Sequence, residues 1–474
     1  MTFASSSGDI ILSGGTINFP AGSTITANNT NDTISSGLAG TTLTKSGSGT
    51  LILPGANTYT GVTTVGAGIL TVSNAASLGA TSGNTVVSSG AALRIAGGIS
   101  IAEPIGIIGA GPGNAGALRS AGANTITAAV TSSGGRFENE DLQTLTLTGG
   151  ITGTTPNTGM VGDYTITNNP INLGANGIFF AGDGATIPPV TGKTIRLNVA
   201  GNNWNDALLF FAAIVKLGAN DVMPASASVR FGWTTVDNAR STLDLNGHNQ
   251  TVATIETTTA VAVPAGSPIS ITGGGTLTVD QSAASKEFTG VISDGATPTA
   301  LIKTGTGTLI LSGNNTYSGV TTVSNGVLQL TSVTATGLAT NTSVYLFTAS
   351  GSLDLNYTGT NRVAALYIDG VAQPNGVYDN TMAPITGTGF LQVGATVSAA
   401  PGNFSGISVT GTTLTLNATN GTPNGPWILL SSTNVALPLI QWGTNSTGNY
   451  DGSGNLNTNL LNTATNAAEF FILK

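Results

Sequence analysis

Short apolar runs alternate with polar turn residues along almost the whole chain. Typical runs lie at residues 51–53, 62–65, 69–72 and 93–95, and each is bounded by Gly, Asn, Ser or Thr. The centres of the runs lie roughly ten residues apart, which indicates short β-strands. Helical periodicity is nearly absent. We therefore expect an all-β protein, and the spacing alone allows a sandwich, a barrel or a β-helix.

One stretch of this pattern occurs twice. Residues 45–65 read KSGSGTLILPGANTYTGVTTV and residues 303–323 read KTGTGTLILSGNNTYSGVTTV, so 16 of 21 positions are identical across a separation of 258 residues. A long repeat unit is typical of stacked architectures. The shared residues are mostly Gly, Thr, Asn, Leu and Val, which build strands and turns rather than an active site.

The repeat predicts one coil of a solenoid, with about 20 to 25 residues per coil. Leu51 and Leu53 alternate toward the core, and Gly61 permits a bend. We expect Asn57 at a corner, where its amide stacks on a neighbouring coil or hydrogen-bonds the turn. Tyr59 is expected to cover this corner with its hydroxyl in water. The second repeat has Leu309, Leu311, Asn315, Tyr317 and Gly319 at these positions.

The chain has 474 residues and no Pro-rich or charged linker before about residue 396. One continuous solenoid is simpler than several sandwich or barrel domains. Composition shifts at residues 398–401, and the segment beyond has its own rhythm of strands and turns. We therefore expect a parallel β-helix over residues 1–395, clearest at 45–72 and 303–330. Residues 396–474 are expected to form a small C-terminal β-sandwich-like domain.

At this point the residues resemble a known family. Residues 49–72, GTLILPGANTYTGVTTVGAGILTV, closely resemble the autotransporter-associated β-strand repeat of bacterial surface proteins. Residues 243–255, 276–295 and 353–393 resemble other segments of that family. The resemblance covers about residues 35 to 395 and implies a right-handed parallel β-helix that is exposed on the cell or released from it.

The end of the chain departs from the family pattern. The last 75 residues are too few for the translocator barrel that usually ends an autotransporter. They resemble instead the small β domain that ends many secreted verrucomicrobial proteins. The N-terminus, MTFASSSGDIILSGG, has neither the basic region nor the apolar core of a signal peptide, so an export signal is expected to lie outside this numbering.

Composition narrows the possible partners. Only 7% of the residues are charged, against about 25% in ordinary proteins, so Thr, Ser and Asn must supply the polar surface. The net charge of −8 disfavours nucleic acid and anionic membranes as partners. The longest apolar run, residues 207–215, is too short for a membrane-spanning helix. There is no cysteine, which excludes disulfides and thiolate metal sites.

The densest charge cluster, RFENED at residues 136–141, is the best candidate for chemistry. Enzymes that act on acidic polysaccharides need clustered carboxylates, and here Glu138 and Glu140 would serve. The alternative is a solvated loop between coils. Neighbouring carboxylates on an extended chain also point to opposite faces, which weakens the enzyme hypothesis.

Other candidates have simpler structural explanations. His248 is the only histidine and lies in a predicted turn. Asp451, Ser453 and Asn455 place oxygen ligands at alternate positions, as calcium loops do, but a hairpin turn explains them as well. The Gly-rich residues 109–113 lack the Lys-Ser/Thr of a phosphate loop. Four tryptophans, Trp204, Trp233, Trp427 and Trp442, either stack on sugars or pack in the core. We expect no catalytic, cofactor-binding or metal-binding residue.

The sequence therefore predicts a non-enzymatic, extracellular or cell-surface structural protein. The ends of a β-helix are open strand edges, and neither end of this sequence shows a charged helical cap. We expect the chain to bind itself head-to-tail in a surface fibre or filament. The alternatives are an adhesin that binds cell-surface glycans and a β-helix enzyme that acts on polysaccharides.

Overall fold

The computed structural model of the protein contains two compact units, Met1–Gly394 and Ala395–Lys474, and each is described by itself. The described residues are 1–3, 8–141, 143–182, 193–232, 241–258, 269–282, 284–331, 337–394, 403–410, 413–421, 426–432, 443–451, 453–461 and 470–473.

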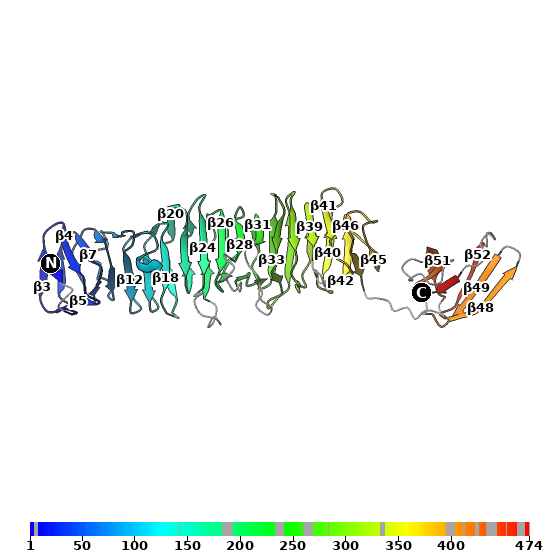
Figure 1. The fold of residues 1–474 in the computed structure, drawn as a ribbon, viewed down its shortest axis with the longest axis horizontal. Coiled ribbons are helices and arrows are strands. Elements are labelled where there is room, and N and C mark those ends of the chain that lie inside the picture. Colours follow the sequence, from blue (N-terminus) through cyan, green and yellow to red (C-terminus); the bar gives the residue numbers. More distant parts are fainter. Residues whose placement is uncertain are drawn as a thin grey trace. The chain divides into compact units, whose positions relative to one another are not determined.

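The N-terminal unit is a parallel β-solenoid (Figure 1). Each strand pairs in parallel with the equivalent strands of the preceding and following coils, so that sheet neighbours are not consecutive in the chain. Leu70, for example, pairs with Leu51 of the coil before and with Leu93 of the coil after. The all-β prediction and the parallel coil are confirmed, whereas the right hand of the coil stays a prediction.

Three long sheets form the faces of the first part of the solenoid, and they have 9, 12 and 9 strands. Further along, sheets of 7 and 5 strands take over. The strands of the 12-stranded sheet are β2 (Ile11–Leu12), β5 (Asp32–Ile34), β8 (Thr50–Leu53), β10 (Ile69–Val72), β12 (Ala92–Ala96), β15 (Leu118–Ala121), β18 (Arg136–Asn139), β21 (Thr158–Val161), β24 (Gly177–Ala181), β26 (Asp206–Phe210), β28 (Ser228–Phe231) and β31 (Thr254–Thr257). Those of the 5-stranded sheet are β34 (Lys286–Phe288), β37 (Thr308–Leu311), β39 (Gly326–Leu330), β41 (Gly351–Leu355) and β46 (Ile385–Gly387).

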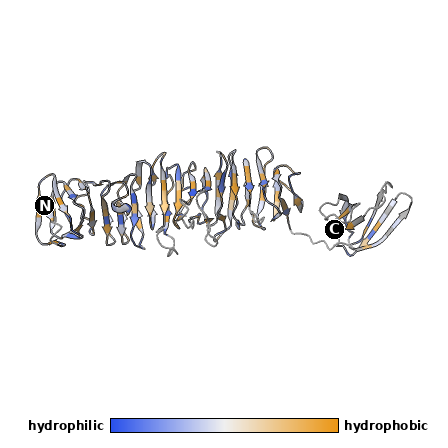
Figure 2. Ribbon diagram, viewed as in Figure 1, coloured by the Kyte–Doolittle hydropathy of each residue, from blue (hydrophilic) through white to orange (hydrophobic). Residues whose placement is uncertain are grey.

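Alternation along each strand builds the core. In β8 and β37, the two leucines at alternate positions are fully buried and the residues between them are half-buried. Stacking such coils produces one continuous apolar cluster that extends from Phe3 to Val393. Figure 2 shows the same alternation as apolar and polar segments along successive strands. A fully buried leucine stabilises the fold by about 1.5–3 kcal/mol, so this cluster accounts for much of the solenoid's stability.

Helix is almost absent. The one helical element among the described residues is a 3-10 turn, η1 (Pro112–Asn114). No helix in the described part of the chain is long and apolar enough to cross a membrane.

The two ends of the solenoid differ. At the N-terminal end, β1 (Thr2–Phe3), β2 and β3 (Thr16–Phe19) each pair with one strand only among the described residues. At the C-terminal end, β44 (Val371–Ala372) and β45 (Gly376–Tyr378) pair antiparallel with the last coil. The expectation of two open ends is therefore wrong at this end, because two short antiparallel strands cover part of the parallel edge.

The C-terminal unit contains two three-stranded antiparallel sheets. One consists of β48 (Asn403–Thr410), β49 (Thr413–Thr419) and β52 (Leu456–Leu461), and the other of β50 (Pro426–Ser432), β51 (Gly443–Asn449) and β53 (Phe470–Leu473). Both sheets contribute to one apolar cluster, with Leu416 and Leu456 from the first and Trp427, Leu429 and Leu473 from the second.

Candidate functional site

The lysine of each repeat is buried inside the solenoid. Lys45 in β7 (Leu43–Ser46) has no exposed surface, and its Nζ donates to the carbonyl oxygens of Gly47 and Gly49 at 2.6 Å each and of Ala67 at 2.9 Å. Ala67 lies one coil further along the chain. The ammonium group therefore uses all three of its donors to join two coils.

The second repeat forms the same arrangement, which we call the lysine cage. Lys303 in β36 (Thr299–Thr304) is fully buried and donates to the carbonyl oxygens of Thr304, Gly305 and Asn325 at 2.6, 2.8 and 3.0 Å. Burial lowers the pKa of Lys45 and of Lys303 to about 8, and a nearby aspartate acts in the opposite direction in each case. Neither cage is predicted from the sequence.

A glycine closes each cage. Gly326 has a φ of +69°, and a Cβ atom there would lie 2.4 Å from the carbonyl oxygens of Gly305 and Gly307 and 2.9 Å from the Lys303 Nζ. Gly68 has a φ of +64° and would meet the Lys45 Nζ at 2.5 Å. Only glycine fits at these two positions, because both the backbone conformation and the close approach exclude a side chain.

The repeated asparagine joins three coils by hydrogen bonds, and we call this arrangement the asparagine clamp. The Asn57 Oδ1 accepts the backbone N–H of Leu38 at 2.9 Å, and its Nδ2 donates to the Ser77 carbonyl oxygen at 2.6 Å. Leu38 belongs to the coil before and Ser77 to the coil after. Asn315 accepts from the Ile292 N–H at 2.8 Å and donates to the Gly337 carbonyl oxygen at 3.1 Å. The predicted corner role is confirmed in its hydrogen-bonded form.

The repeated tyrosine is not placed as predicted. Tyr59 and Tyr317 are fully buried, and their hydroxyls lie 2.8 Å from the Oγ1 atoms of Thr63 and Thr321. The expectation of a hydroxyl in water is wrong, because the threonine four residues further along supplies a buried partner. Burial raises the pKa of both tyrosines above the ordinary range, so that they stay neutral. Lysine, asparagine and tyrosine thus all face inward, and the lysine and the asparagine join adjacent coils.

The charge cluster at residues 136–141 begins in a strand, so the prediction of a solvated loop is wrong for its first part. Residues Arg136–Asn139 form β18, in which Phe137 and Asn139 are buried while Arg136 and Glu138 are half-buried. The parallel register places Arg94 of β12 beside Arg119 of β15, and Arg119 beside Glu138. Successive coils therefore bring arginines and carboxylates into one row on the outer face of the 12-stranded sheet.

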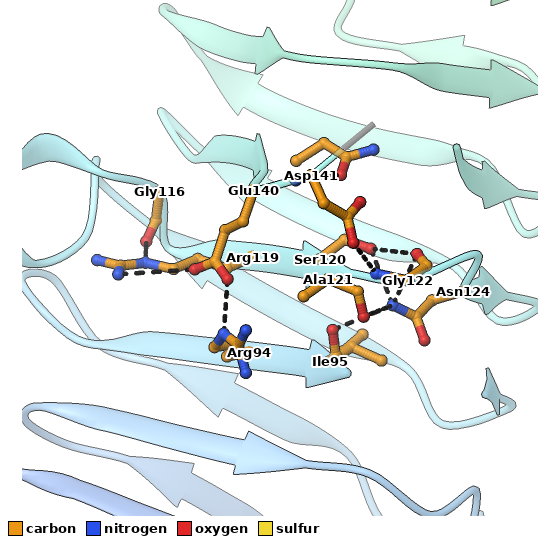
Figure 3. A network of polar contacts seen from close by, with 11 residues as sticks. Arg94, Ile95, Gly116, Arg119, Ser120, Ala121, Gly122, Asn124, Glu140 and Asp141 are labelled. Atoms are coloured by element: carbon orange, nitrogen blue, oxygen red, sulfur yellow. Dashed lines mark hydrogen bonds and ion pairs between the residues drawn. The ribbon is translucent and has the colours of Figure 1, made fainter. Parts of the chain in front are cut away.

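Each carboxylate of this cluster has a partner. Figure 3 shows the Glu140 carboxylate near both arginines, with 2.6 Å to the Arg94 Nε and 3.9 Å to an Arg119 terminal nitrogen. The Arg136 guanidinium donates to Glu138 at 2.9 and 3.1 Å. The Gly122 N–H donates to the Asp141 Oδ2 at 2.5 Å. Burial raises the pKa of Glu138, and Arg136 acts against this effect.

This arrangement pairs Glu138 and Glu140 with arginines and Asp141 with a backbone N–H. A glycosidase requires one carboxyl group held protonated opposite a second that is free to act. Glu138 instead accepts hydrogen bonds from Arg136 of its own coil, and Glu140 accepts one from Arg94, two coils before. The cluster joins the coils at β12, β15 and β18.

The remaining candidates serve local structure. His248 is half-buried in a turn, where its backbone N–H donates to the Leu245 carbonyl oxygen at 2.8 Å. Residues 109–113 lead into η1, and the Pro112 carbonyl oxygen accepts from Arg119. Trp204 is fully buried and Trp427 nearly so, whereas Trp233 and Trp442 lie outside the described residues.

The proposed calcium run at residues 451–455 is a turn between the two sheets of the C-terminal unit. The Asp451 Oδ1 accepts the N–H groups of Ser453 and Asn455 at 2.8 Å each, so the carboxylate holds its own turn. The hairpin alternative is wrong, because the flanking strands β51 and β52 belong to different sheets. No group of three or more potential metal ligands was found among the described residues.

One buried acid was not predicted. Glu103 lies between β13 (Ser100–Ile101) and β14 (Ile105–Ile108) and is 2% exposed. Its Oε1 accepts from the Thr85 Oγ1 at 2.9 Å, and its Oε2 has no hydrogen-bond partner in the described structure. Burial raises the pKa of Glu103 to about 7. The only signal in the sequence was a lone acid within an uncharged apolar stretch.

The parallel coils and the buried lysine, asparagine and tyrosine of each repeat define a repeat-containing parallel β-solenoid. The chain carries two copies of the passenger-associated-transport-repeat, at residues 43–72 and 301–330, which confirms the recognition of the repeat family. A stretch of 103 residues is 39% identical to the adhesin BmaC autotransporter of Brucella suis biovar 1 (strain 1330). That match covers 21% of this chain and 3% of the adhesin. No solved structure matches the chain. These findings agree with the repeat-containing β-solenoid that the structure shows.

Proposed function

We propose that the protein is a non-enzymatic, extracellular or cell-surface protein of the adhesin type, in which the β-solenoid is the scaffold. One observation carries the proposal: the polar side chains that the repeats share point inward and bind the solenoid's own backbone or side chains. Such residues stabilise a long scaffold and are inaccessible to a substrate. The match to an adhesin supports the same proposal.

The charge cluster also supports a non-enzymatic role. Its carboxylates are neutralised by Arg94 and Arg136, and removing a proton from a substrate would require a free base. The rival proposal of a polysaccharide-active enzyme predicts that Glu138→Gln and Glu140→Gln abolish the release of reducing ends from an acidic polysaccharide.

The test compares adhesion with hydrolysis for the same purified full-length chain. We expect saturable binding to cell surfaces or to glycan-coated plates and no depolymerisation of acidic polysaccharides. Depolymerisation that is lost in both glutamine variants would refute the proposal. Binding that is unchanged in both variants would support it.

We propose self-association as a second function, and the pairing of β1, β2 and β3 with one strand each among the described residues favours it. Ile11 in β2 is 70% exposed, and exposed strand edges with apolar residues are prone to pair with another chain. A head-to-tail filament would use this edge. Electron microscopy and sedimentation over a range of concentrations test the proposal. Filaments that disappear in Ile11→Lys would support it, and uniform monomers at high concentration would contradict it.

We also propose that the C-terminal unit is a small β-sandwich-like domain. Its two sheets share the cluster of Leu416, Leu429 and Leu456, as two packed sheets do. Expression of residues 396–474 alone tests the domain assignment through the cooperativity of its thermal unfolding.

A further inference from the structure

The C-terminal unit has a cavity of about 620 Å³ where its two sheets meet. The first sheet contributes Asn417 from β49 and Asn457 from β52, and the second contributes Trp427 from β50 and Asn449 from β51. The turn between the sheets adds Asp451 and Asn455. The volume lies within the range of about 300–1,000 Å³ that is typical of small-molecule sites.

Trp427 gives the cavity an aromatic wall. The residue is 5% exposed, and its neighbour across the strand pair is Gly448. A Cβ atom on Gly448 would lie 2.6 Å from the indole ring, so the glycine lets the ring lie against the backbone of β51. The indole Nε1 is buried without a hydrogen-bond partner in the described structure, although buried tryptophans usually have one.

Amide side chains dominate the rest of the lining. Each asparagine offers two donors and an acceptor, as the hydroxyl groups of a sugar both donate and accept. Asn449, Asn455 and Asn457 are exposed and Asn417 is half-buried, so a ligand can reach them without unfolding the unit.

Charge restricts the ligand further. Among the described residues that line the cavity, Asp451 is the one charged side chain, and none of them is Lys or Arg. Its carboxylate accepts two backbone N–H groups, which lowers its pKa and keeps it negative. A negative site without cations repels uronates, sialic acid and phosphate and accepts a neutral ligand.

We infer that this cavity binds a neutral sugar unit of a surface glycan. The ring of the sugar contacts the Trp427 side chain, and its hydroxyls bind the amides of Asn417, Asn449 and Asn457. That the sugar belongs to a surface glycan rests on the proposed adhesin function. That the cavity binds a neutral sugar does not depend on the proposed function.

Isothermal titration of the full chain tests the inference with D-glucose, D-galactose, D-mannose and N-acetylglucosamine, and with polygalacturonate as the acidic comparison. We expect saturable binding of at least one neutral sugar and none of polygalacturonate. Each of Asn449→Ala and Asn457→Ala should weaken binding about three- to tenfold, because each removes a hydrogen-bonding group. Trp427→Phe should weaken it by a similar factor, because the smaller ring removes part of the cavity wall that contacts the sugar.

Ser408→Ala is the matched control, because Ser408 is exposed in β48 and does not line the cavity. Both asparagines are exposed in their strands, so their variants keep the test valid if Trp427→Phe fails to fold. Absence of binding by all four sugars, or preference for polygalacturonate, overturns the inference. Cell adhesion that persists without sugar binding leaves the proposed function standing, whereas sugar binding without adhesion supports the cavity and contradicts the proposed function.

Discussion

Replacing Lys303 by methionine removes the cation from one lysine cage while keeping a side chain of similar length. The three carbonyl oxygens of Thr304, Gly305 and Asn325 then lose the hydrogen bonds that Lys303 donates. The variant therefore measures what a buried charge contributes to the joining of two coils.

The magnitude follows from two opposing contributions. Three hydrogen bonds from a charged donor are worth about 1.5–3 kcal/mol each, or about 4.5–9 kcal/mol together. Burial opposes them, because a lysine pKa that falls from 10.5 to about 8 disfavours the charged form in the folded state by about 3 kcal/mol. Methionine avoids this cost of burial. We expect a net loss of about 1–6 kcal/mol, with a central value of about 3 kcal/mol.

Amide hydrogen exchange read by mass spectrometry measures this loss locally. A change of about 3 kcal/mol raises the opening equilibrium on the order of 100-fold, so residues 299–331 should lose about two decades of protection. Solenoid coils contact only their neighbours, and residues 43–72 should exchange as before. The control is Lys216→Met, which removes a half-exposed ion pair with Asp244 at 3.0 Å and should cost less than about 1 kcal/mol.

Two results would refute the reasoning. Equal protection of residues 299–331 in Lys303→Met and Lys216→Met would show that the cage contributes nothing beyond a surface ion pair. A uniform loss of protection that includes residues 43–72 would show that the solenoid opens as one unit rather than coil by coil.

Two further predictions concern other buried polar groups. Glu103 has a pKa of about 7 when folded and about 4.5 when unfolded, so the folded state binds more protons between these values and stability falls by about 3 kcal/mol as pH rises from 4.5 through 7. Glu103→Gln should remove this slope in thermal unfolding between pH 4.5 and 8, and an unchanged slope would exclude Glu103 as its source. Asn315→Leu leaves the Ile292 N–H and the Gly337 carbonyl oxygen without the clamp, which should cost about 2–4 kcal/mol. Limited proteolysis should then cut near residue 315, and a wild-type cleavage pattern would contradict the role of the clamp.

The sequence was sufficient to predict the coil because its apolar positions are periodic. Leu309 and Leu311 alternate with half-buried residues, and strands of this pattern have few other ways to bury one face. The corner asparagine was also predictable, since a buried amide at a turn must bind backbone groups. These features depend on residues within one coil.

The lysine cage could not be read from the sequence in the same way. Its acceptors are backbone carbonyls, which every residue carries, and one of them lies about a coil further along the chain. A lysine beside Gly-Ser-Gly therefore looks like an exposed charge at a turn. The Tyr59 hydroxyl was misplaced for another reason, because its partner, Thr63, lies only four residues further along and was assigned to a strand without any side-chain contact.

The antiparallel strands at the C-terminal end of the solenoid could not be predicted from the sequence for a different reason. Val371 and Val377 lie in strands of two and three residues that fold back on the last coil. Short antiparallel pairs produce no periodic signal, and their pairing depends on turns at Asp369–Gly370 and nearby residues. The C-terminal cavity is likewise formed by residues from five strands and a turn, so no local motif marks it.

The lysine cages and asparagine clamps also determine how the protein responds to mechanical load. In a solenoid the hydrogen bonds between coils run along the long axis, so tension on the two ends pulls coils apart one after another. A freed coil of about 20 residues extends from one strand spacing of about 4.8 Å to roughly 70 Å, which dissipates work while the rest stays folded. A coil fastened by a buried ammonium group resists longer than its neighbours. Unfolding under tension should therefore pause at the two coils that contain a lysine cage. A surface protein pulled by flow would then lengthen in steps.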